Sequence, residues 1–552
     1  MKPQLVIPMS GSGQRFLDKG YKVPKPLMPI DGKPLVAHVL DMYPNWEDVL
    51  FIVNSEHLSD ESLDLRGVLN NLRPNGKIFP ISPHTKGPGW AIKQAGNALN
   101  VDSPIVVNYC DFTCLWDANE FKKQLKDRSD WEGIIACYSG FHPHMLRSTK
   151  FAYVDLEPSG YVRQIQEKNS YTQSPMKEWA SSGTYAFKSA KVLLQAIDEQ
   201  IESGIALNGE YYTSLTYVPI LKKGKKVSIF PLKKFMQWGT PADLEEFLYW
   251  SSKFQQLAKL ELCGNVLGTA IVLAAGAGKR FVDLGYELPK PLLPVSGSPV
   301  LKQIVKGLSA GHNVIVGRAD DIVWAKAIES VCVRNGFGYL ELQSLSSGQA
   351  DTARIALEKL DSDEDPVTIA ACDSLIVFNT TDMKSKFERA DVIVWVQKVN
   401  PYAKSKPEHF GWVRAENSTE QITELLVKEA PNQIDNWGSI TGTFTFRTAS
   451  VAKNLIDALV ERNIRVNGEL YLDSIVKVCL DKGIKILAAE PHFFVSLGTP
   501  AEYETFRYWQ ECFHNWLQHP YRLNLDPYVE PENLQKIESD WALDPVGRRL
   551  IR

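Results

Sequence analysis

The sequence lacks long hydrophobic runs and any excess of charge of one sign. No apolar run reaches the about 18 residues that a membrane-spanning helix requires. The Met1-Lys2-Pro3 start is not followed by the apolar segment that is typical of a signal peptide. A formal net charge of −4 over 552 residues argues against nucleic-acid binding and against a polybasic membrane contact. We therefore expect a cytoplasmic protein with no membrane span and no nucleic-acid partner.

Cysteine is scarce as well. The eight cysteines include no C-x-x-C pair and no histidine cluster with zinc-binding spacing. In a cytoplasmic chain such scattered thiols are expected to be reduced and mostly buried. The sequence therefore gives no sign of a disulfide framework or of a zinc site.

What the sequence does contain is a long internal repeat that starts with a glycine-rich stretch. Gly11-Ser12-Gly13-Gln14-Arg15-Phe16 follows the apolar run Leu5-Val6-Ile7-Pro8-Met9, which is typical of a buried strand. A second copy begins 265 residues later, and 12 of 19 positions are identical between residues 11–29 and 276–294. The length allows two to four domains, and the repeat favours two.

The repeated residues suit a triphosphate. Glycines after a strand let backbone N–H groups approach an anion, because no Cβ stands in the way. Arg15 adds a planar fork for phosphate oxygens, and Lys25, held between prolines, adds a compact charge. The alternative to a phosphate site is that the glycines only form a turn and that Arg15 and Lys25 are solvated. The predicted phosphate-binding and catalytic set is Gly11, Ser12, Gly13, Arg15 and Lys25, with Gly276, Ala277, Gly278, Arg280 and Lys290 in the second copy.

Two better-known phosphate loops are excluded. A Walker A loop needs G-x-x-x-x-G-K-[ST], which neither copy has. A dinucleotide-binding loop needs a third glycine where Phe16 and Phe281 stand.

An aspartate follows a buried strand in each copy. Asp111 follows the apolar run 104–109, and Asp373 follows 367–371. An acidic residue there is costly unless it binds something. Mg²⁺ held by one carboxylate and substrate phosphates is a suitable occupant, and a strand-end cap is the alternative.

The pattern G-x-G-x-R-F…P-K-P-L resembles the signature of the sugar-phosphate nucleotidyltransferases, the nucleoside-diphosphate-sugar pyrophosphorylases. Ile7-Pro8-Met9, Gly20-Tyr21 and Pro24-Lys25-Pro26-Leu27 are most similar to the branch found among capsule and surface-polysaccharide genes. The resemblance covers about 250 residues twice. It implies an α/β fold of two tandem Rossmann-like domains, each with a mixed, mainly parallel sheet. The strand–helix–strand pattern of residues 5–53 indicates the same class.

The resemblance also implies roles for further residues. Glycine-centred loops at Gly87 and at Gly348-Gln349 would read the base, and Asp111 and Asp373 would hold Mg²⁺. The acceptor phosphate would contact Lys168 and Lys428, and the sugar hydroxyls would lie near Glu210 and Glu469. For both glutamates a helix first-turn position, favoured by the helix dipole, is the alternative.

The chain departs from the family pattern at three positions. Many members carry a second metal-binding aspartate where this chain has Gln237 and Ser496, so the metal is held by one aspartate and phosphates or activity is reduced. Val427 stands before Lys428, whereas Glu167 stands before Lys168. The base loops also differ, so we expect two nucleotide sites that differ in base or acceptor.

We expect nucleotidyl transfer from an NTP to a phosphorylated small molecule, a sugar 1-phosphate in the first instance, for capsule or surface-polysaccharide precursors. The alternatives are a glycosyltransferase that consumes a nucleotide sugar and a nucleotide-binding sensor or scaffold. A glycosyltransferase would typically show a D-x-D motif, which the residues after Asp111 and Asp373 lack. The expected domains are 1–255 and 266–515. Residues 253–268 are expected to form the linker, an amphipathic stretch ending in Cys263-Gly264-Asn265. The tail 516–552, ending in Arg548-Arg549-Leu550-Ile551-Arg552, is expected to pack on the second domain as a strap, and an interaction tail is the alternative.

Overall fold

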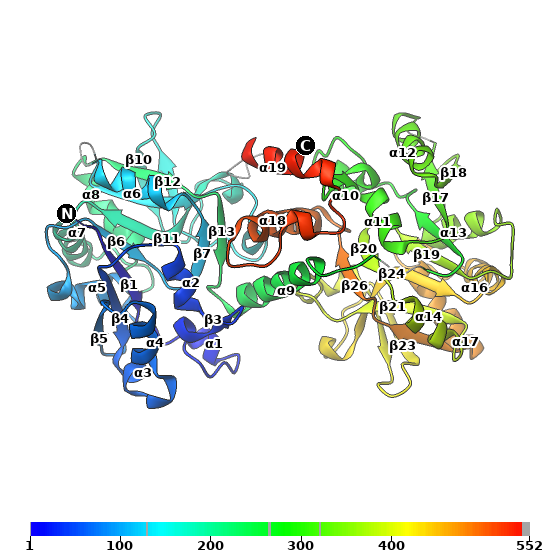
Figure 1. Cartoon of the computed structure of the whole chain (residues 1–552), viewed down its shortest axis with the longest axis horizontal. Helices are drawn as coiled ribbons and strands as arrows, with labels where there is room; N and C mark the ends of the chain where they lie inside the picture. Colours follow the sequence, from blue (N-terminus) through cyan, green and yellow to red (C-terminus); the bar gives the residue numbers. More distant parts are fainter. Residues whose placement is uncertain (1, 128–130, 263–265, 320–321, 544–552) are drawn as a thin grey trace. The chain divides into compact units, whose positions relative to one another are not determined.

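The computed structural model describes residues 2–127, 131–262, 266–319 and 322–543 (Figure 1). The chain forms two compact units, one ending at Trp250 and the other spanning Ser251–Trp541. We refer to them as unit 1 and unit 2.

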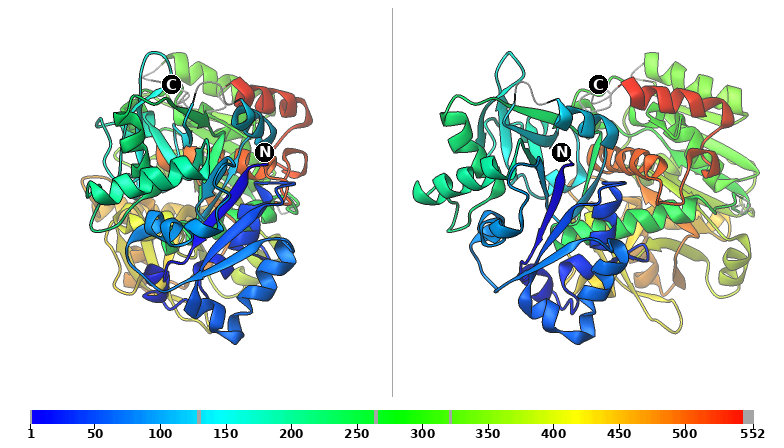
Figure 2. Two further views of the ribbon diagram at one scale, coloured as in Figure 1. Left: turned by 90° about the vertical axis from the view of Figure 1, so that its left-hand side faces the viewer. Right: turned by 60° about the vertical axis from the view of Figure 1, so that its left-hand side comes forward.

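Unit 1 is built on a sheet whose centre is β1 (Gln4–Met9). β1 pairs in parallel with β4 (Val49–Asn54) on one side and with β6 (Ile105–Asn108) on the other. The dark blue β1 accordingly runs through the interior of the unit rather than along an edge (Figure 2). The remaining strands are the parallel β5 (Lys77–Ile81) and a group around the antiparallel β11 (Trp179–Phe187): β8 (Gly133–Tyr138), β9 (Tyr153–Leu156), β10 (Val162–Gln166) and β12 (Val227–Pro231).

The apolar runs explain this arrangement. Every residue of β4 and of β6 is buried, as expected for parallel strands covered by helices on both faces. Val6, Leu50 and Ile105 pack in one hydrophobic core with Ile92 and Ile197 from two covering helices.

Unit 2 repeats the same strand order. Its central β14 (Thr269–Leu273) pairs in parallel with β17 (His312–Arg318) and β19 (Val367–Ala371). The other strands are β18 (Gly338–Leu342), β21 (Val392–Gln397), β22 (Gly411–Ala415), β23 (Ile422–Val427), β24 (Gly438–Phe446) and β25 (Ile486–Ala489). The prediction of an α/β fold with mixed, mainly parallel sheets is confirmed in both units.

Short strand pairs and helices complete each unit. The two-stranded sheets are β2–β3 (Pro29–Ile30, Lys33–Pro34) and β7–β13 (Phe112–Leu115, Lys234–Gln237) in unit 1, and β15–β16 (Pro294–Val295, Ser298–Pro299) and β20–β26 (Ser374–Val377, Phe493–Ser496) in unit 2. The helices of unit 1 are α1 (Gln14–Leu17), α2 (Leu35–Asp41), α3 (Ser55–Ser59), α4 (Leu65–Leu72), α5 (Gly87–Gln94), α6 (Ala118–Lys126), α7 (Ala190–Glu202) and α8 (Tyr217–Lys222). Those of unit 2 are α10 (Lys279–Val282), α11 (Val300–Leu308), α12 (Ile322–Asn335), α13 (Gln349–Leu357), α14 (Thr380–Phe387), α15 (Pro401–Ser405), α16 (Ala449–Glu461), α17 (Ile475–Lys482), α18 (Pro500–Asn515) and α19 (Leu534–Leu543).

The stretch expected to be a linker is helical at its start. Helix α9 (Pro241–Leu257) runs from the end of unit 1 into unit 2, so residues 253–257 belong to it. Cys263-Gly264-Asn265 lie outside the described residues.

Much of the tail contacts unit 2. Gln303 on α11 donates a hydrogen bond from Nε2 to the Tyr528 carbonyl at 2.7 Å, and Lys302 pairs with Glu530 at 2.6 Å. The arginine-rich end of the tail, residues 548–552, lies outside the described residues.

Two expectations from composition can be compared with the described residues. Seven cysteines lie among them, and all seven are buried free thiols. Among the helices of the described ranges, none has both the length and the hydrophobicity of a membrane span.

Candidate active site

The glycine loops turn the chain from a central strand into a short helix. Gly13 (φ 69°) and Gly278 (φ 59°) precede α1 and α10 in the left-handed conformation, which glycine adopts without strain. In neither described loop does a side chain cap the helix start. Arg15 and Arg280 follow two residues later and are exposed. Each loop therefore presents backbone and a guanidinium at the carboxyl end of its strand.

The predicted lysine and the predicted metal ligand lie together in both units. Lys25 Nζ donates to Asp111 Oδ2 at 2.8 Å and to the Gly239 carbonyl at 3.1 Å. Lys290 Nζ lies 3.4 Å from Asp373 Oδ2. Both lysine side chains are 17% exposed, so each ion pair lies within the unit and not on its open surface. Residues 86 positions apart in unit 1 are thus joined at one point.

Each strand-end aspartate is anchored through its backbone. The Asp111 carbonyl accepts from the Trp238 N–H at 2.8 Å, and the Asp373 carbonyl accepts from the Leu497 N–H at 2.7 Å. The same strand pairs bring Gln237 and Ser496 opposite the start of β7 and β20. The two departures from the family pattern therefore stand beside the predicted metal ligands.

The surroundings of these departures differ between the units. Gln237 Nε2 donates to Asp243 Oδ2 at 2.8 Å, and Asp243 also pairs with Arg147 at 2.7 Å. In unit 2 a Cβ on Gly498 would lie 3.5 Å from Ser496 Oγ and from Asp373 Oδ2, and 3.4 Å from Glu502 Oε2. A carboxylate from the first turn of α18 therefore lies near Asp373.

The donor set at the strand ends fits a weakly protein-bound Mg²⁺. Among the described residues, no three histidine, cysteine, aspartate or glutamate side chains form a metal cage. Mg²⁺ is held in many enzymes by one or two carboxylates together with substrate phosphates. Asp111 and Asp373 each offer one partly exposed carboxylate, which suits Mg²⁺ bound by one carboxylate and substrate phosphates.

The base loops are packed against the segments that carry the predicted sugar-binding glutamates. A Cβ on Gly87 would lie 2.9 Å from Tyr211 N, and one on Gly348 would lie 2.6 Å from Leu470 N. Both glycines have positive φ, 83° and 139°. Glycine is required at these positions by close backbone approach and by conformation together.

The predicted sugar-binding glutamates follow Asn-Gly turns. Asn208 (φ 53°) and Gly209 (φ 78°) both have positive φ, as do Asn467 (φ 51°) and Gly468 (φ 83°). Two consecutive positive φ values define the tight turn that Asn-Gly favours, and the turns close with bridges at Glu210 and Glu469. The alternative of a helix first-turn carboxylate is wrong, because each glutamate closes a turn before the next helical segment begins.

The predicted acceptor lysines share an unusual backbone. Lys168 and Lys428 both have φ 58°, which is strained for a residue with a Cβ and is often found at functional sites. Lys168 Nζ donates to Tyr212 Oη and lies 4.5 Å from that ring centroid. Lys428 Nζ donates to the His409 carbonyl and lies 5.3 Å from the Tyr471 ring centroid.

Electrostatic effects show how closely the predicted residues gather in unit 2. Burial lowers the pKa of Lys428, and the charges that act on it include Arg280, Asp373 and Glu469. In unit 1 burial raises the pKa of Tyr212, Glu210 raises it further, and Arg15 lowers it. The arginine of the glycine loop is therefore close enough to act on the charge of a residue on the predicted acceptor side in both units.

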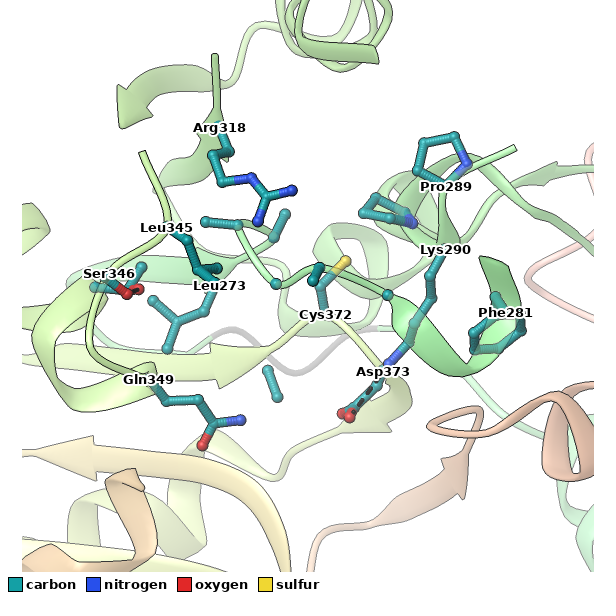
Figure 3. A pocket seen from close by; sticks show the side chains of 18 of the residues that line it. Leu273, Phe281, Pro289, Lys290, Arg318, Leu345, Ser346, Gln349, Cys372 and Asp373 are labelled. Carbon is teal, nitrogen blue, oxygen red and sulfur yellow. Dashed lines mark hydrogen bonds and ion pairs between the residues drawn. The ribbon is translucent and has the colours of Figure 1, made fainter. Parts of the chain in front are cut away.

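A cavity of about 710 Å³ in unit 2 collects most of the predicted nucleotide-binding residues (Figure 3). In Figure 3 the Lys290 and Asp373 side chains point toward one another, and Gln349 lies on the opposite side of the cavity. The predicted residues among its lining are Gly276, Ala277, Gly278, Lys290, Gly348, Gln349, Asp373 and Glu469. Arg280 and Lys428 are not part of this lining.

Other lining residues were not predicted from the sequence. They include Arg318, Trp324, Ile328, Leu345, Arg465 and Tyr471. Arg318 ends the apolar strand β17, as Asp373 follows the apolar strand β19. The same strand-end argument that identified Asp373 therefore applies to Arg318.

Comparison with known proteins identifies the family of the chain. The sequence profile described as "Nucleotidyl transferase" matches residues 5–246 and 269–463, which is more than half of the chain. The chain belongs to the nucleotidyl transferase family, with one match in each unit.

Individual relatives are distant. The bifunctional protein GlmU of Bacillus subtilis (strain 168) is 26% identical over 243 residues, 42% of this chain and 48% of that protein. The GlmU of Shouchella clausii is 29% identical over 227 residues, 41% of this chain and 46% of that protein. The chain thus spans about half the length of these curated relatives. A nucleoside-diphosphate-sugar pyrophosphorylase structure from Vibrio cholerae has a TM-score of 0.37 and 20% identity, covering 45% of this chain and 100% of the other.

Proposed function

We propose that each unit catalyses nucleotidyl transfer from an NTP to a phosphate monoester, in the simplest case a sugar 1-phosphate, with release of pyrophosphate. Membership of the nucleotidyl transferase family supports the reaction class. The cavity of unit 2 carries the proposal, because one space is lined by a glycine loop, a lysine, a base loop and a strand-end aspartate. The matching lysine–aspartate pair in unit 1 supports the same chemistry there.

The triphosphate would lie along the glycine loop. Backbone N–H groups of Gly11–Gly13 and Gly276–Gly278 would approach its oxygens, and Arg15 and Arg280 would bind the β- and γ-phosphates. Lys25 and Lys290 would lie near the α-phosphate, where negative charge grows during transfer. Each lysine is held in place by its aspartate, so little reorganisation is needed when the nucleotide binds.

Mg²⁺ would supply further neutralisation of the phosphate charge, held by Asp111 or Asp373 together with phosphate oxygens. The Gln237 amide oxygen and the Ser496 hydroxyl are neutral and would serve at most as weak additional ligands.

The chemical step needs no general base. A phosphate monoester has a second pKa near 6, so its attacking oxygen is already mostly ionised at neutral pH. That oxygen forms a bond to the α-phosphorus while the bond from the α-phosphorus to the bridging oxygen breaks, and pyrophosphate leaves. Catalysis would then consist of positioning by the chain's own groups and of charge neutralisation by these groups together with Mg²⁺.

The acceptor would bind on the side of Lys168 or Lys428. Each lysine would contact the acceptor phosphate, and Glu210 or Glu469 would accept hydrogen bonds from sugar hydroxyls. The motif resemblance supports a place in the synthesis of capsule or surface-polysaccharide precursors.

The test is pyrophosphate release by the full chain, measured for each NTP against a panel of phosphate monoesters with Mg²⁺ present. Acceptor-dependent release supports the proposal. Release of a nucleoside diphosphate from a nucleotide sugar, with no pyrophosphate formed in any NTP reaction, would instead indicate a glycosyltransferase. Nucleotide binding without turnover across the whole panel would indicate a sensor or scaffold.

A further inference from the structure

The carboxylate next to the acceptor lysine comes from different positions in the two units. In unit 1 Glu167 precedes Lys168 and accepts a hydrogen bond from the Ser214 hydroxyl, which is fully buried. In unit 2 Val427 precedes Lys428, and Asp473 occupies the position that corresponds to Ser214. Both residues follow their Asn-Gly turn at the same distance, six positions after Asn208 and Asn467.

A third position changes together with these two. The Lys168 N–H donates to the Phe151 carbonyl at 2.8 Å, and the Lys428 N–H donates to the Phe410 carbonyl at 3.0 Å. Because these bonds match, the residues after the phenylalanines also correspond, Ala152 in unit 1 and Gly411 in unit 2.

Gly411 provides the space for the new carboxylate. A Cβ on Gly411 would overlap Asp473 Oδ2, so an alanine there is incompatible with the observed Asp473 side chain. Gly411 lies directly opposite Val427 in the β22–β23 register. The Asp473 carboxylate therefore lies against the strand pair that ends at Lys428. Ala152, Glu167 and Ser214 of unit 1 thus correspond to Gly411, Val427 and Asp473 of unit 2, and all three residues differ.

We propose that Asp473 is the positioning carboxylate of the acceptor site in unit 2, and that it does for Lys428 what Glu167 does for Lys168. It keeps the lysine ammonium charged and oriented for the acceptor phosphate, a role that rests on the proposed function. On this proposal the chain has kept a carboxylate near the lysine at each acceptor site, and the carboxylate has moved from a strand end to the segment after the Asn-Gly turn.

The charges around Lys428 define what Asp473 contributes. Burial lowers the pKa of Lys428, and Arg280 lowers it further. Asp473, Asp373 and Glu469 raise it, with Asp473 the largest of the three. Burial raises the pKa of Asp473, Asp373 raises it further, and Lys428 lowers it. Without Asp473 the ammonium would be buried with its main counter-charge removed.

The test measures the protonation of Lys428 directly in the full-length chain. Competitive labelling with acetic anhydride across the alkaline range, read by mass spectrometry, follows the pKa of single lysines without requiring turnover. Asp473→Ser should move the Lys428 labelling curve to lower pH by about one unit or more, because an opposite charge has been removed. Val427→Glu in the Asp473→Ser background should move the curve back.

Gly411→Ala provides a second variant that leaves Asp473 in the sequence. Its methyl group should displace the carboxylate and shift the Lys428 curve in the same direction. In the Val427→Glu/Asp473→Ser background, which reproduces the arrangement of unit 1, Gly411→Ala should have no further effect. Lys168, measured in the same samples, is the matched control and should not move.

An unchanged Lys428 curve in both Asp473→Ser and Gly411→Ala would overturn the inference, whatever the activity. A shifted curve that Val427→Glu restores, in a chain that releases no pyrophosphate with any acceptor, would support the pairing and count against the proposed function. In an active chain, the acceptor KM of unit 2 should rise in Asp473→Ser and fall again when Val427→Glu is added. Loss of fold alone would change the far-UV spectrum and would not be rescued by Val427→Glu.

Discussion

The two units share one side of the candidate site and differ on the other. Both keep the glycine loop, the arginine, the lysine–aspartate pair and the left-handed acceptor lysine. They differ in the base loop and in the source of the carboxylate next to that lysine. In the proposed reaction the shared glycine loop, arginine and lysine–aspartate pair would contact the triphosphate, which is the same for every NTP, whereas the differing residues would lie near the base or the acceptor. The comparison therefore suggests two sites with a common reaction and separate specificities.

The units also differ beside the strand-end aspartate. In unit 1 Gln237 is tied to Asp243, whose carboxylate is in turn paired with Arg147. In unit 2 Glu502 is buried with a raised pKa, and its Oε1 has no hydrogen-bond partner among the described residues. The carboxylate at this position is thus paired with an arginine in unit 1, whereas in unit 2 the Glu502 carboxylate accepts a hydrogen bond from Thr499 Oγ1 at 3.0 Å.

The largest effect is expected from the strand-end aspartates. Asp111→Asn and Asp373→Asn should each lower the activity of their own unit by about a thousandfold or more, because a metal's stabilisation of phosphate charge is worth several kcal/mol. The double variant and a chelator should each remove all pyrophosphate release. Full turnover in the presence of a chelator would contradict the assignment of Asp111 and Asp373 as metal ligands.

The next largest effect is expected from substitution of the glycine-loop arginines, which should affect one unit at a time. Arg15→Ala and Arg280→Ala should each cost about 2–4 kcal/mol of transition-state stabilisation in one unit and leave the other intact. The measurement is kcat/KM for every active NTP and acceptor pair. If either variant behaves like the wild type with all of them, that unit has no catalytic role. The exposed Lys19→Ala and Lys279→Ala variants provide controls for loss of a nearby positive charge.

The sequence was sufficient for the fold, and on the predicted triphosphate side it selected residues that the structure brings together. The continuous apolar runs at residues 5–9 and 104–109 predicted buried parallel strands, and the structure has β1 and β6 there. Asp111 could be identified because a carboxylate after a buried strand is costly unless it binds something. Lys25 could be identified because it lies between two prolines in the repeated motif. Their contact at 2.8 Å joins two motifs that the sequence could treat only separately.

The acceptor side could not be predicted in the same way. Asp473 follows leucine in a segment with no glycine or proline signal, so its proximity to Lys428 depends on how β22, β23 and α17 pack. In unit 2 the position that lacks the glutamate, Val427, and the position that carries the new carboxylate, Asp473, are 46 residues apart in the sequence. Position-by-position comparison shows the loss of a glutamate and the gain of an aspartate as two separate changes, because only the folded unit brings the two positions together.

Close backbone approach gives a smaller, structural effect. Gly348→Ala should destabilise the base loop of unit 2 by about 1–3 kcal/mol, because the methyl group would meet Leu470 N and the backbone has positive φ. Gly87→Ala should act in the same way on unit 1, against Tyr211 N. Gly311→Ala is the control, since a Cβ there would meet nothing within 4 Å. Hydrogen exchange at α13 and α5 measures the effect, and equal protection in Gly348→Ala and Gly311→Ala would contradict it.

The smallest expected effect concerns pH and separates a functional carboxylate from a structural one. Burial raises the pKa of Asp473 from 3.8 to about 6. Above pH 6 the carboxylate is ionised in both the folded and the unfolded chain, and its burial then lowers the stability of the folded chain. Asp473→Asn should therefore increase the stability of unit 2 by on the order of 1 kcal/mol at pH 8. As pH falls through 6 toward 3.8, the folded chain binds the proton first, and the gain should disappear.

Hydrogen exchange of the β22 and α17 amides in the full chain, at several pH values, measures this local stability. Asp457→Asn, which removes an exposed carboxylate on α16 of the same unit, is the control for the loss of one charge. A carboxylate kept for stability would give the opposite result, weaker protection in Asp473→Asn at pH 8. Stronger protection together with a weaker acceptor site would mean that unit 2 retains Asp473 for its action on Lys428, at the expense of its own stability.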